Sequence, residues 1–88
     1  MTLSTTVQLT VRYFGAARAA AHAESEILTV EHGTSVAELV TRLSGRNDRL
    51  AAVLGRCSYL CDGVAVRDTT AQVRAGQIID VLPPFAGG

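Results

Sequence analysis

The segment from Ser35 to Ser44 is the clearest helix in the sequence, and it restricts what the rest of the chain can fold into. Ser35 and Glu38 have the spacing of a capping box, in which each side chain accepts a backbone N–H at the start of the helix. Apolar residues then recur at helical spacing and form one continuous face: Val36, Leu39, Val40 and Leu43. Each buried aliphatic side chain contributes about 1.5–3 kcal/mol. Because a chain of 88 residues holds a single core, we expect this helix to lie on a sheet.

Two strands are predicted before this helix. Val7 to Phe14 alternates between apolar and polar residues, except that Phe14 falls on the polar face, and Glu26 to Val30 shows a similar pattern. We expect the two strands to form an antiparallel hairpin. The alanine-rich segment between them, Ala16 to Ala23, is too short and uniform to carry an amphipathic stripe. It is therefore predicted to be a loop with one helical turn.

The part of the chain after the helix is predicted to complete the sheet. Asp48 to Leu54 has the pattern of a second short helix, and Asp62-Gly63 is a strong hairpin signal between the strands Tyr59–Cys61 and Val64–Val66. Gln77 to Leu82 is almost entirely apolar, which favours the interior of a sheet over its edge. A right-handed crossover should bring the strand after the helix back parallel to an earlier strand. The order of elements indicates an α+β architecture with a mixed sheet and one main helix across it.

Charge and hydropathy exclude several classes of function. Eight arginines balance eight acidic residues without forming a basic stripe, which argues against a nucleic-acid partner. The sequence contains no apolar run long enough to span a membrane and no apolar leader, so no membrane association is expected and a cytoplasmic location is predicted. The chain also has no lysine, so it could not form isopeptide-linked chains through its own side chains.

The two cysteines, Cys57 and Cys61, do not have the spacing of a zinc site. If both lie on one strand, their separation is about 13 Å. That distance is well beyond the limit of roughly 7 Å for a disulfide. We therefore expect two free thiols and no metal site.

The C-terminal segment Pro83-Pro84-Phe85-Ala86-Gly87-Gly88 is predicted to leave the sheet as a thin tail. The two prolines remove two N–H donors, so the last strand must stop before them. The six residues could reach about 20 Å from the body of the protein. Because glycine has no Cβ, Gly87-Gly88 could pass through a narrow slot and leave the terminal carboxylate accessible. The alternative is a frayed chain end without function.

This combination resembles the β-grasp (ubiquitin-like) fold and, more narrowly, the small subunit of molybdopterin synthase, a sulfur carrier. Three stretches carry the resemblance: Val11–Arg18, Ser35–Leu39 and Gly76–Gly88, of which the two prolines before Gly-Gly are the most specific part. Ala19 and Gln77 depart from the family's pattern, because an acidic residue is usual at both positions.

The resemblance implies a single β-grasp domain over residues 1–82 and an extended tail over residues 83–88. The C-terminal Gly88 would be adenylated by a partner enzyme that uses ATP, converted to a thiocarboxylate, and would donate its sulfur to a pterin precursor to form the molybdopterin dithiolene. The chain would be a non-catalytic carrier subunit of a sulfurtransferase, with no bound cofactor. Its large partner subunit would form a heterotetramer with it, and the adenylating enzyme would be a second partner.

The resemblance also assigns partner-binding residues. Phe14 and Leu82, together with Phe85 in the tail, would form an apolar patch, and Arg18 would make a polar contact with a partner or with the tail. For the apolar residues, plain core packing is the alternative.

Other functions remain open at this point. The chain could be a sulfur carrier for cysteine or thiamine synthesis, or a ubiquitin-like modifier attached through Gly88 to lysines of other proteins. It could also be a β-grasp interaction module whose tail is inert.

Overall fold

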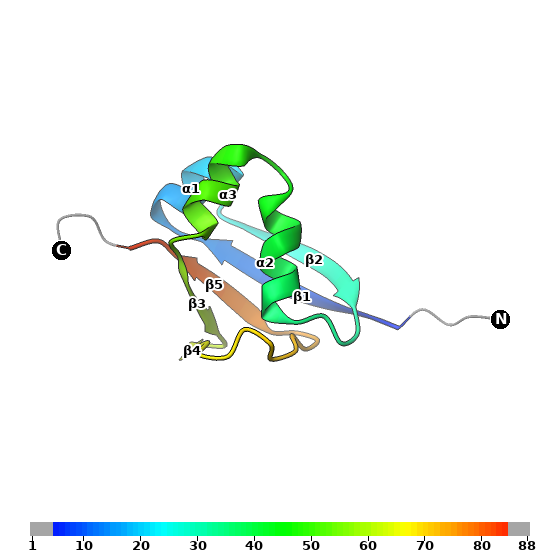
Figure 1. The fold of residues 1–88 in the computed structure, drawn as a ribbon. Coiled ribbons are helices and arrows are strands. Elements are labelled where there is room, and N and C mark those ends of the chain that lie inside the picture. The colour runs from blue at the N-terminus through cyan, green and yellow to red at the C-terminus, as the bar shows by residue number, and fades with distance from the viewer. Residues whose placement is uncertain (1–4, 85–88) are drawn as a thin grey trace.

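The structure, a computed structural model, describes residues 5–84 and places three helices on one face of a five-stranded sheet (Figure 1). In chain order the elements are β1 (Thr6–Tyr13), α1 (Gly15–Ala21), β2 (Ser25–Glu31), α2 (Val36–Ser44), α3 (Asp48–Leu54), β3 (Ser58–Cys61), β4 (Val64–Ala65) and β5 (Ile78–Leu82). Among residues 5–84, no helix lies on the other face of the sheet, which we call the open face. This arrangement is the ubiquitin-like β-grasp fold that the sequence predicts.

The strand order is β2-β1-β5-β3-β4. Strand β1 pairs antiparallel with β2, as predicted, and parallel with β5. The apolar strand β5 lies between β1 and β3, which confirms its predicted interior position. The prediction that the strand after the helix returns parallel is correct only for β5. The first strand after the helices, β3, runs antiparallel to β5. The β3–β4 hairpin reverses the chain, and β5 then runs in the same direction as β4.

Helix α2 begins as predicted. The Ser35 hydroxyl accepts the backbone N–H of Glu38 at 3.1 Å, and the Glu38 carboxylate accepts the backbone N–H of Ser35 at 3.0 Å. Its apolar face packs on the inward-facing side chains of the sheet. The largest fully buried side chains of this core are Leu9, Val11, Tyr13, Val36, Leu39, Leu43, Leu50, Ile79 and Val81.

The alanine-rich segment is a helix, α1, and the prediction of a loop with one turn is wrong. Ala17 and Ala20 are fully buried, and α1 packs against α3. A short helix without an amphipathic stripe is marginal by itself, so this contact supplies the stability that the local sequence lacks. The small alanine side chains allow the two helices to approach closely.

The structure ends β1 at Tyr13, so Phe14, which the sequence pattern places in that strand, is instead the N-cap residue of α1. The predictions for α3, the Asp62-Gly63 turn and the two cysteines agree with the structure. The side chain of Asn47 accepts the backbone N–H of Leu50 at 2.7 Å and so caps α3. Asp62 and Gly63 both have positive φ, 51° and 83°, as a two-residue turn between antiparallel strands requires. Cys57 lies just before β3 and Cys61 at its end, and both are free, half-buried thiols.

Candidate partner-binding surface at the root of the tail

The root of the tail is held against the start of α1. Pro83 follows β5 directly and is half-buried, and Pro84 is exposed. A Cβ added to Gly15, whose φ is +52°, would lie 3.7 Å from the Cγ of Pro83. The backbone N–H of Phe14 donates to the carbonyl of Val81 at 3.2 Å. The direction in which the chain leaves the sheet is therefore set by the junction of β1, α1 and β5.

The predicted tail residues Phe85, Ala86, Gly87 and Gly88 lie outside the described residues. What the structure describes is the surface from which they depart. Two features of that surface adjoin Leu82 and the two prolines: a hollow on the side of the helices and an apolar patch on the open face.

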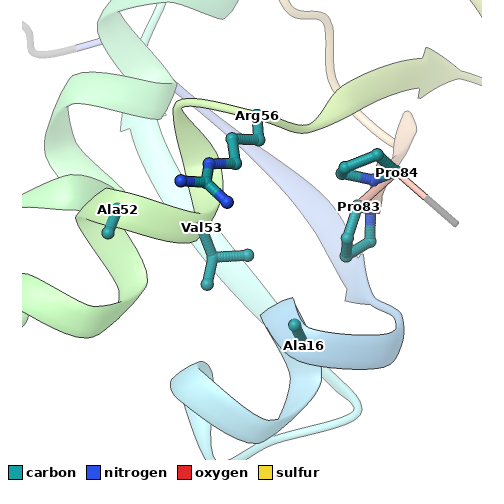
Figure 2. Close-up of a pocket in the computed structure, with 6 residues that line it drawn as sticks. All are labelled: Ala16, Ala52, Val53, Arg56, Pro83 and Pro84. Atoms are coloured by element: carbon teal, nitrogen blue, oxygen red, sulfur yellow. The ribbon is translucent and has the colours of Figure 1, made fainter. Parts of the chain in front are cut away.

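The hollow has a volume of about 500 Å³ and lies between α1, α3 and the root of the tail (Figure 2). It is lined by Ala16, Ala52, Val53, Arg56, Pro83 and Pro84. Its walls are mainly apolar, and among the described residues that line it Arg56 alone carries a charge. The sequence does not indicate this hollow, because it depends on the contact between two helices that are distant in the chain.

The apolar patch lies on the open face and consists of Phe14, Leu60, Ile78 and Leu82. Alternation along β5 places Ile78 and Leu82 on the same face as Asp80, and the pairing of β3 with β5 places Leu60 opposite Asp80. Phe14 is 40% exposed and Ile78 is 38% exposed, and both are among the most exposed large apolar side chains in the described residues. Leu60 and Leu82 are half-buried.

An ion pair occupies the centre of this patch. The parallel register places Arg12 opposite Asp80, and the guanidinium donates through Nε to Oδ1 at 2.6 Å and through Nη2 to Oδ2 at 2.8 Å. The hydrogen bond and the charge of Asp80 raise the pKa of Arg12. The side chain of Asp80 is only 8% exposed, whereas that of Arg12 is 48% exposed. The guanidinium carbon also lies 5.8 Å from the centre of the Phe14 ring, within the range of a cation–π contact.

The sequence-predicted partner-binding residues are only partly brought together. Phe14 and Leu82 both belong to the open-face patch, and Phe14 is not packed in the core. Arg18 lies on α1 and pairs with Glu24 in the loop before β2. The structure thus gives Arg18 an acidic neighbour within the chain, although position 19 is alanine.

Other polar groups have structural explanations. Tyr13 donates its hydroxyl to Glu26 at 2.9 Å, and Arg46 donates to the same carboxylate at 2.5 Å. The hydrogen bond from Arg46 is the main reason that the pKa of Glu26 is lowered. Burial raises the pKa of both thiols, which makes them poor nucleophiles at neutral pH.

No group of three His, Cys, Asp or Glu side chains within residues 5–84 is arranged to hold a metal ion. Within the same residues, each helix falls short of the length and apolar character that a membrane span requires.

Comparison with known proteins extends these observations to the tail. Residues 11–88 match the family model described as the ThiS family, and the matched region includes both terminal glycines. No curated protein is similar enough in sequence to match the chain.

Solved structures from several organisms have the same fold. The HVO 2177 protein of Haloferax volcanii is 26% identical, with a TM-score of 0.85, and the match covers 100% of this chain and 92% of that one. SAMP1 from Haloferax volcanii is 20% identical, with a TM-score of 0.79 and coverage of 92% and 99%. A chain in the complex of subunits 1 and 2 of the molybdopterin-converting factor from Helicobacter pylori is 23% identical, with a TM-score of 0.66 and coverage of 93% and 100%.

Proposed function

The chain belongs to the ThiS family, and on that premise we propose that it is a sulfur carrier whose C-terminal glycine, Gly88, is converted to a thiocarboxylate. The observation that carries this proposal is the family match, which extends through the tail to Gly88. The fixed root of the tail supports it, because a carrier must present its terminus to other proteins in a defined direction.

The proposed chemistry requires little from the chain itself. An α-carboxylate has an ordinary pKa of about 3.3–3.7 and is ionised at neutral pH. Bound to a partner enzyme, this carboxylate attacks the α-phosphorus of ATP, and pyrophosphate leaves. Hydrosulfide then attacks the acyl carbon of the adenylate, AMP leaves, and the thiocarboxylate forms. The partner supplies the ATP site and the catalytic groups, and the chain supplies Gly88 and a surface that docks.

We place this carrier in molybdenum-cofactor synthesis, as the small subunit of molybdopterin synthase. The large subunit would receive the tail and use the thiocarboxylate sulfur to build a dithiolene on a pterin precursor. The resemblance of the Pro83-Pro84 tail to that family supports this role, and so does the likeness to one chain of the Helicobacter pylori complex, which contains both subunits of its converting factor. A heterotetramer with two copies of each subunit is the assembly we propose.

The docking surface that we propose consists of Phe14 and Leu82 on the open face, with Phe85 in the tail. Phe14 is exposed, and Leu82 immediately precedes the prolines, so a protein that holds the tail would cover both side chains. For Arg18 we propose a polar contact with a partner. Its existing pair with Glu24 would hold the guanidinium in place for that contact.

A second candidate is a ubiquitin-like modifier joined through Gly88 to lysines of other proteins. The likeness to SAMP1, whose relatives among the solved structures are described as small archaeal modifier proteins, favours it. Carriers for thiamine or cysteine synthesis belong to the same chemical class as the leading proposal.

Two experiments separate these functions. The thiocarboxylated chain is mixed with the large subunit of molybdopterin synthase from the same cells and with the pterin precursor, and dithiolene formation is followed. A modifier would instead appear in cell lysate as conjugates of higher mass that disappear when Gly88 is deleted. Dithiolene formation without conjugates supports the synthase role. Conjugates without dithiolene formation would replace that role with the modifier.

A further inference from the structure

We propose that Arg12 is a partner-recognition residue, which receives a hydrogen-bond acceptor from the protein that takes up the tail, and that Asp80 positions it. This inference rests on the proposed function, because it assumes that a partner protein covers the surface beside the tail. It adds a polar specificity element to the apolar patch, and the sequence resemblance does not assign a role to either residue.

The geometry makes the guanidinium available and the carboxylate unavailable. The side chain of Asp80 is 8% exposed and accepts hydrogen bonds through both carboxylate oxygens, whereas the side chain of Arg12 is 48% exposed. Nε and Nη2 of Arg12 are committed to Asp80. Within residues 5–84 the structure gives Nη1 no acceptor. A protein that covers this face therefore meets the exposed guanidinium of Arg12, whereas the Asp80 carboxylate is already occupied by hydrogen bonds from Arg12.

The orientation of the donor is fixed before any partner arrives. Two hydrogen bonds hold the planar guanidinium to Asp80, and the ring of Phe14 lies 5.8 Å from its central carbon. Strand register fixes both residues, since Arg12 and Asp80 are direct partners in the β1–β5 ladder. A donor held in this way loses little side-chain entropy when it binds, which strengthens the contact it makes.

Position along the chain links the ion pair to the tail. Asp80 precedes Leu82 by two residues on the same face of β5, and Pro83 follows Leu82. A protein that encloses Pro83 and Pro84 lies next to Leu82 and reaches Arg12 over a short distance across the sheet.

These observations specify the chemistry of the partner surface. It should be mainly apolar, to cover Phe14, Ile78 and Leu82, and should carry one carboxylate or main-chain carbonyl opposite Arg12. A partner without this acceptor would bury the remaining N–H donors of Arg12 without a hydrogen bond and would bind the chain more weakly. The ion pair would thus select among proteins with apolar docking surfaces.

The test uses the full chain and a variant that removes both members of the pair, Arg12→Met with Asp80→Val. This variant leaves the net charge unchanged and leaves no lone buried carboxylate. A second variant, Arg12→Lys, keeps the charge but loses the planar fork. The control is Arg49→Met, which changes an exposed arginine on α3, on the helix-covered side of the sheet. Binding to the large subunit of molybdopterin synthase is measured by calorimetry, and folding is checked by thermal unfolding.

We expect the double variant and the unaltered chain both to unfold cooperatively. The double variant should bind the large subunit about 10- to 100-fold more weakly, the effect of losing a hydrogen bond to a charged group. Arg12→Lys should recover part of the affinity, and Arg49→Met should bind like the unaltered chain. Equal affinities of the double variant and the unaltered chain would overturn the inference alone. If the unaltered chain neither binds the large subunit nor acquires sulfur, the proposed function fails, and the inference fails with it.

Discussion

The backbone N–H of Phe14 donates to the carbonyl of Val81 at 3.2 Å, and this bond joins the start of α1 to the last strand two residues before the tail. Phe14 is also the N-cap residue of α1, in an extended conformation, and its ring lies on the open face beside Arg12. One residue therefore takes part in the junction that directs the tail and in the surface proposed to bind a partner.

Replacement of Phe14 should weaken partner binding more than it weakens the fold. Phe14→Ser removes an apolar side chain that is 40% exposed in the free protein. The substitution should therefore reduce the free energy of partner binding more than the free energy of unfolding. We expect affinity for the large subunit to fall about tenfold or more, with a small change in the unfolding midpoint. Val64→Ser is the matched control, because Val64 is 69% exposed on β4, and its pairing with Cys61 places it on the face of the sheet that carries the helices. Equal losses of affinity in both variants would remove Phe14 from the docking surface.

Replacement of Gly15 should destabilise the protein because of its backbone conformation. Gly15 has a φ of +52°, and a non-glycine residue in the left-handed region costs roughly 1–2 kcal/mol. Gly15→Ala should lower the free energy of unfolding by about that amount in chemical denaturation. Gly55→Ala is the control, since Gly55 has a φ of −63° and a Cβ there makes only ordinary contacts, the nearest at 3.6 Å. A stable Gly15→Ala variant would mean that α1 can begin in another conformation.

Glu26 should make stability depend on pH in the acidic range. The hydrogen bond from Arg46 lowers the pKa of Glu26 in the folded protein below its value in the unfolded chain, about 4.3. The ionised Glu26 therefore stabilises the folded protein above that unfolded pKa, and this stabilisation is lost as the pH falls through the lower folded pKa. Because the pair is partly exposed, we expect Glu26→Gln to cost on the order of 1 kcal/mol at pH 7. At a pH below the lowered pKa of Glu26, the difference between the two proteins should disappear. Denaturation curves at both pH values measure it, and a constant difference would show that the lost charge is not the cause.

The two thiols should take no part in sulfur transfer. Burial raises the pKa of Cys57 and Cys61, so little thiolate is present at neutral pH. A variant with both cysteines replaced by alanine should acquire sulfur at Gly88 at the same rate as the unaltered chain, as followed by intact mass. A slower rate in a folded double variant would place one thiol on the route of the sulfur.

The sequence predicts those parts of the fold that depend on neighbouring residues. The capping box and apolar face define α2, and the positive φ values at Asp62-Gly63 follow from the type of turn. The sequence does not predict α1, because its stability comes from packing against α3, which lies elsewhere in the chain.

The candidate partner-binding surface is likewise predictable from the sequence only where neighbouring residues determine it. Leu82 and the prolines can be identified from the chain alone, because they end an apolar strand. Asp80 stands out in the sequence as the one charge in that strand, but its pairing with Arg12 requires the register between β1 and β5, which no local pattern encodes. The hollow beside the prolines likewise requires knowledge of how α1 meets α3.

The most direct test of the proposed function is the intact mass of the chain after incubation with a candidate adenylating enzyme, ATP and a sulfur donor, with a chain lacking Gly88 as control. We expect a gain equal to the mass difference between sulfur and oxygen, located at the C-terminus and confined to the full-length chain. No gain by the full-length chain, with an enzyme shown to be active on another carrier, would contradict it.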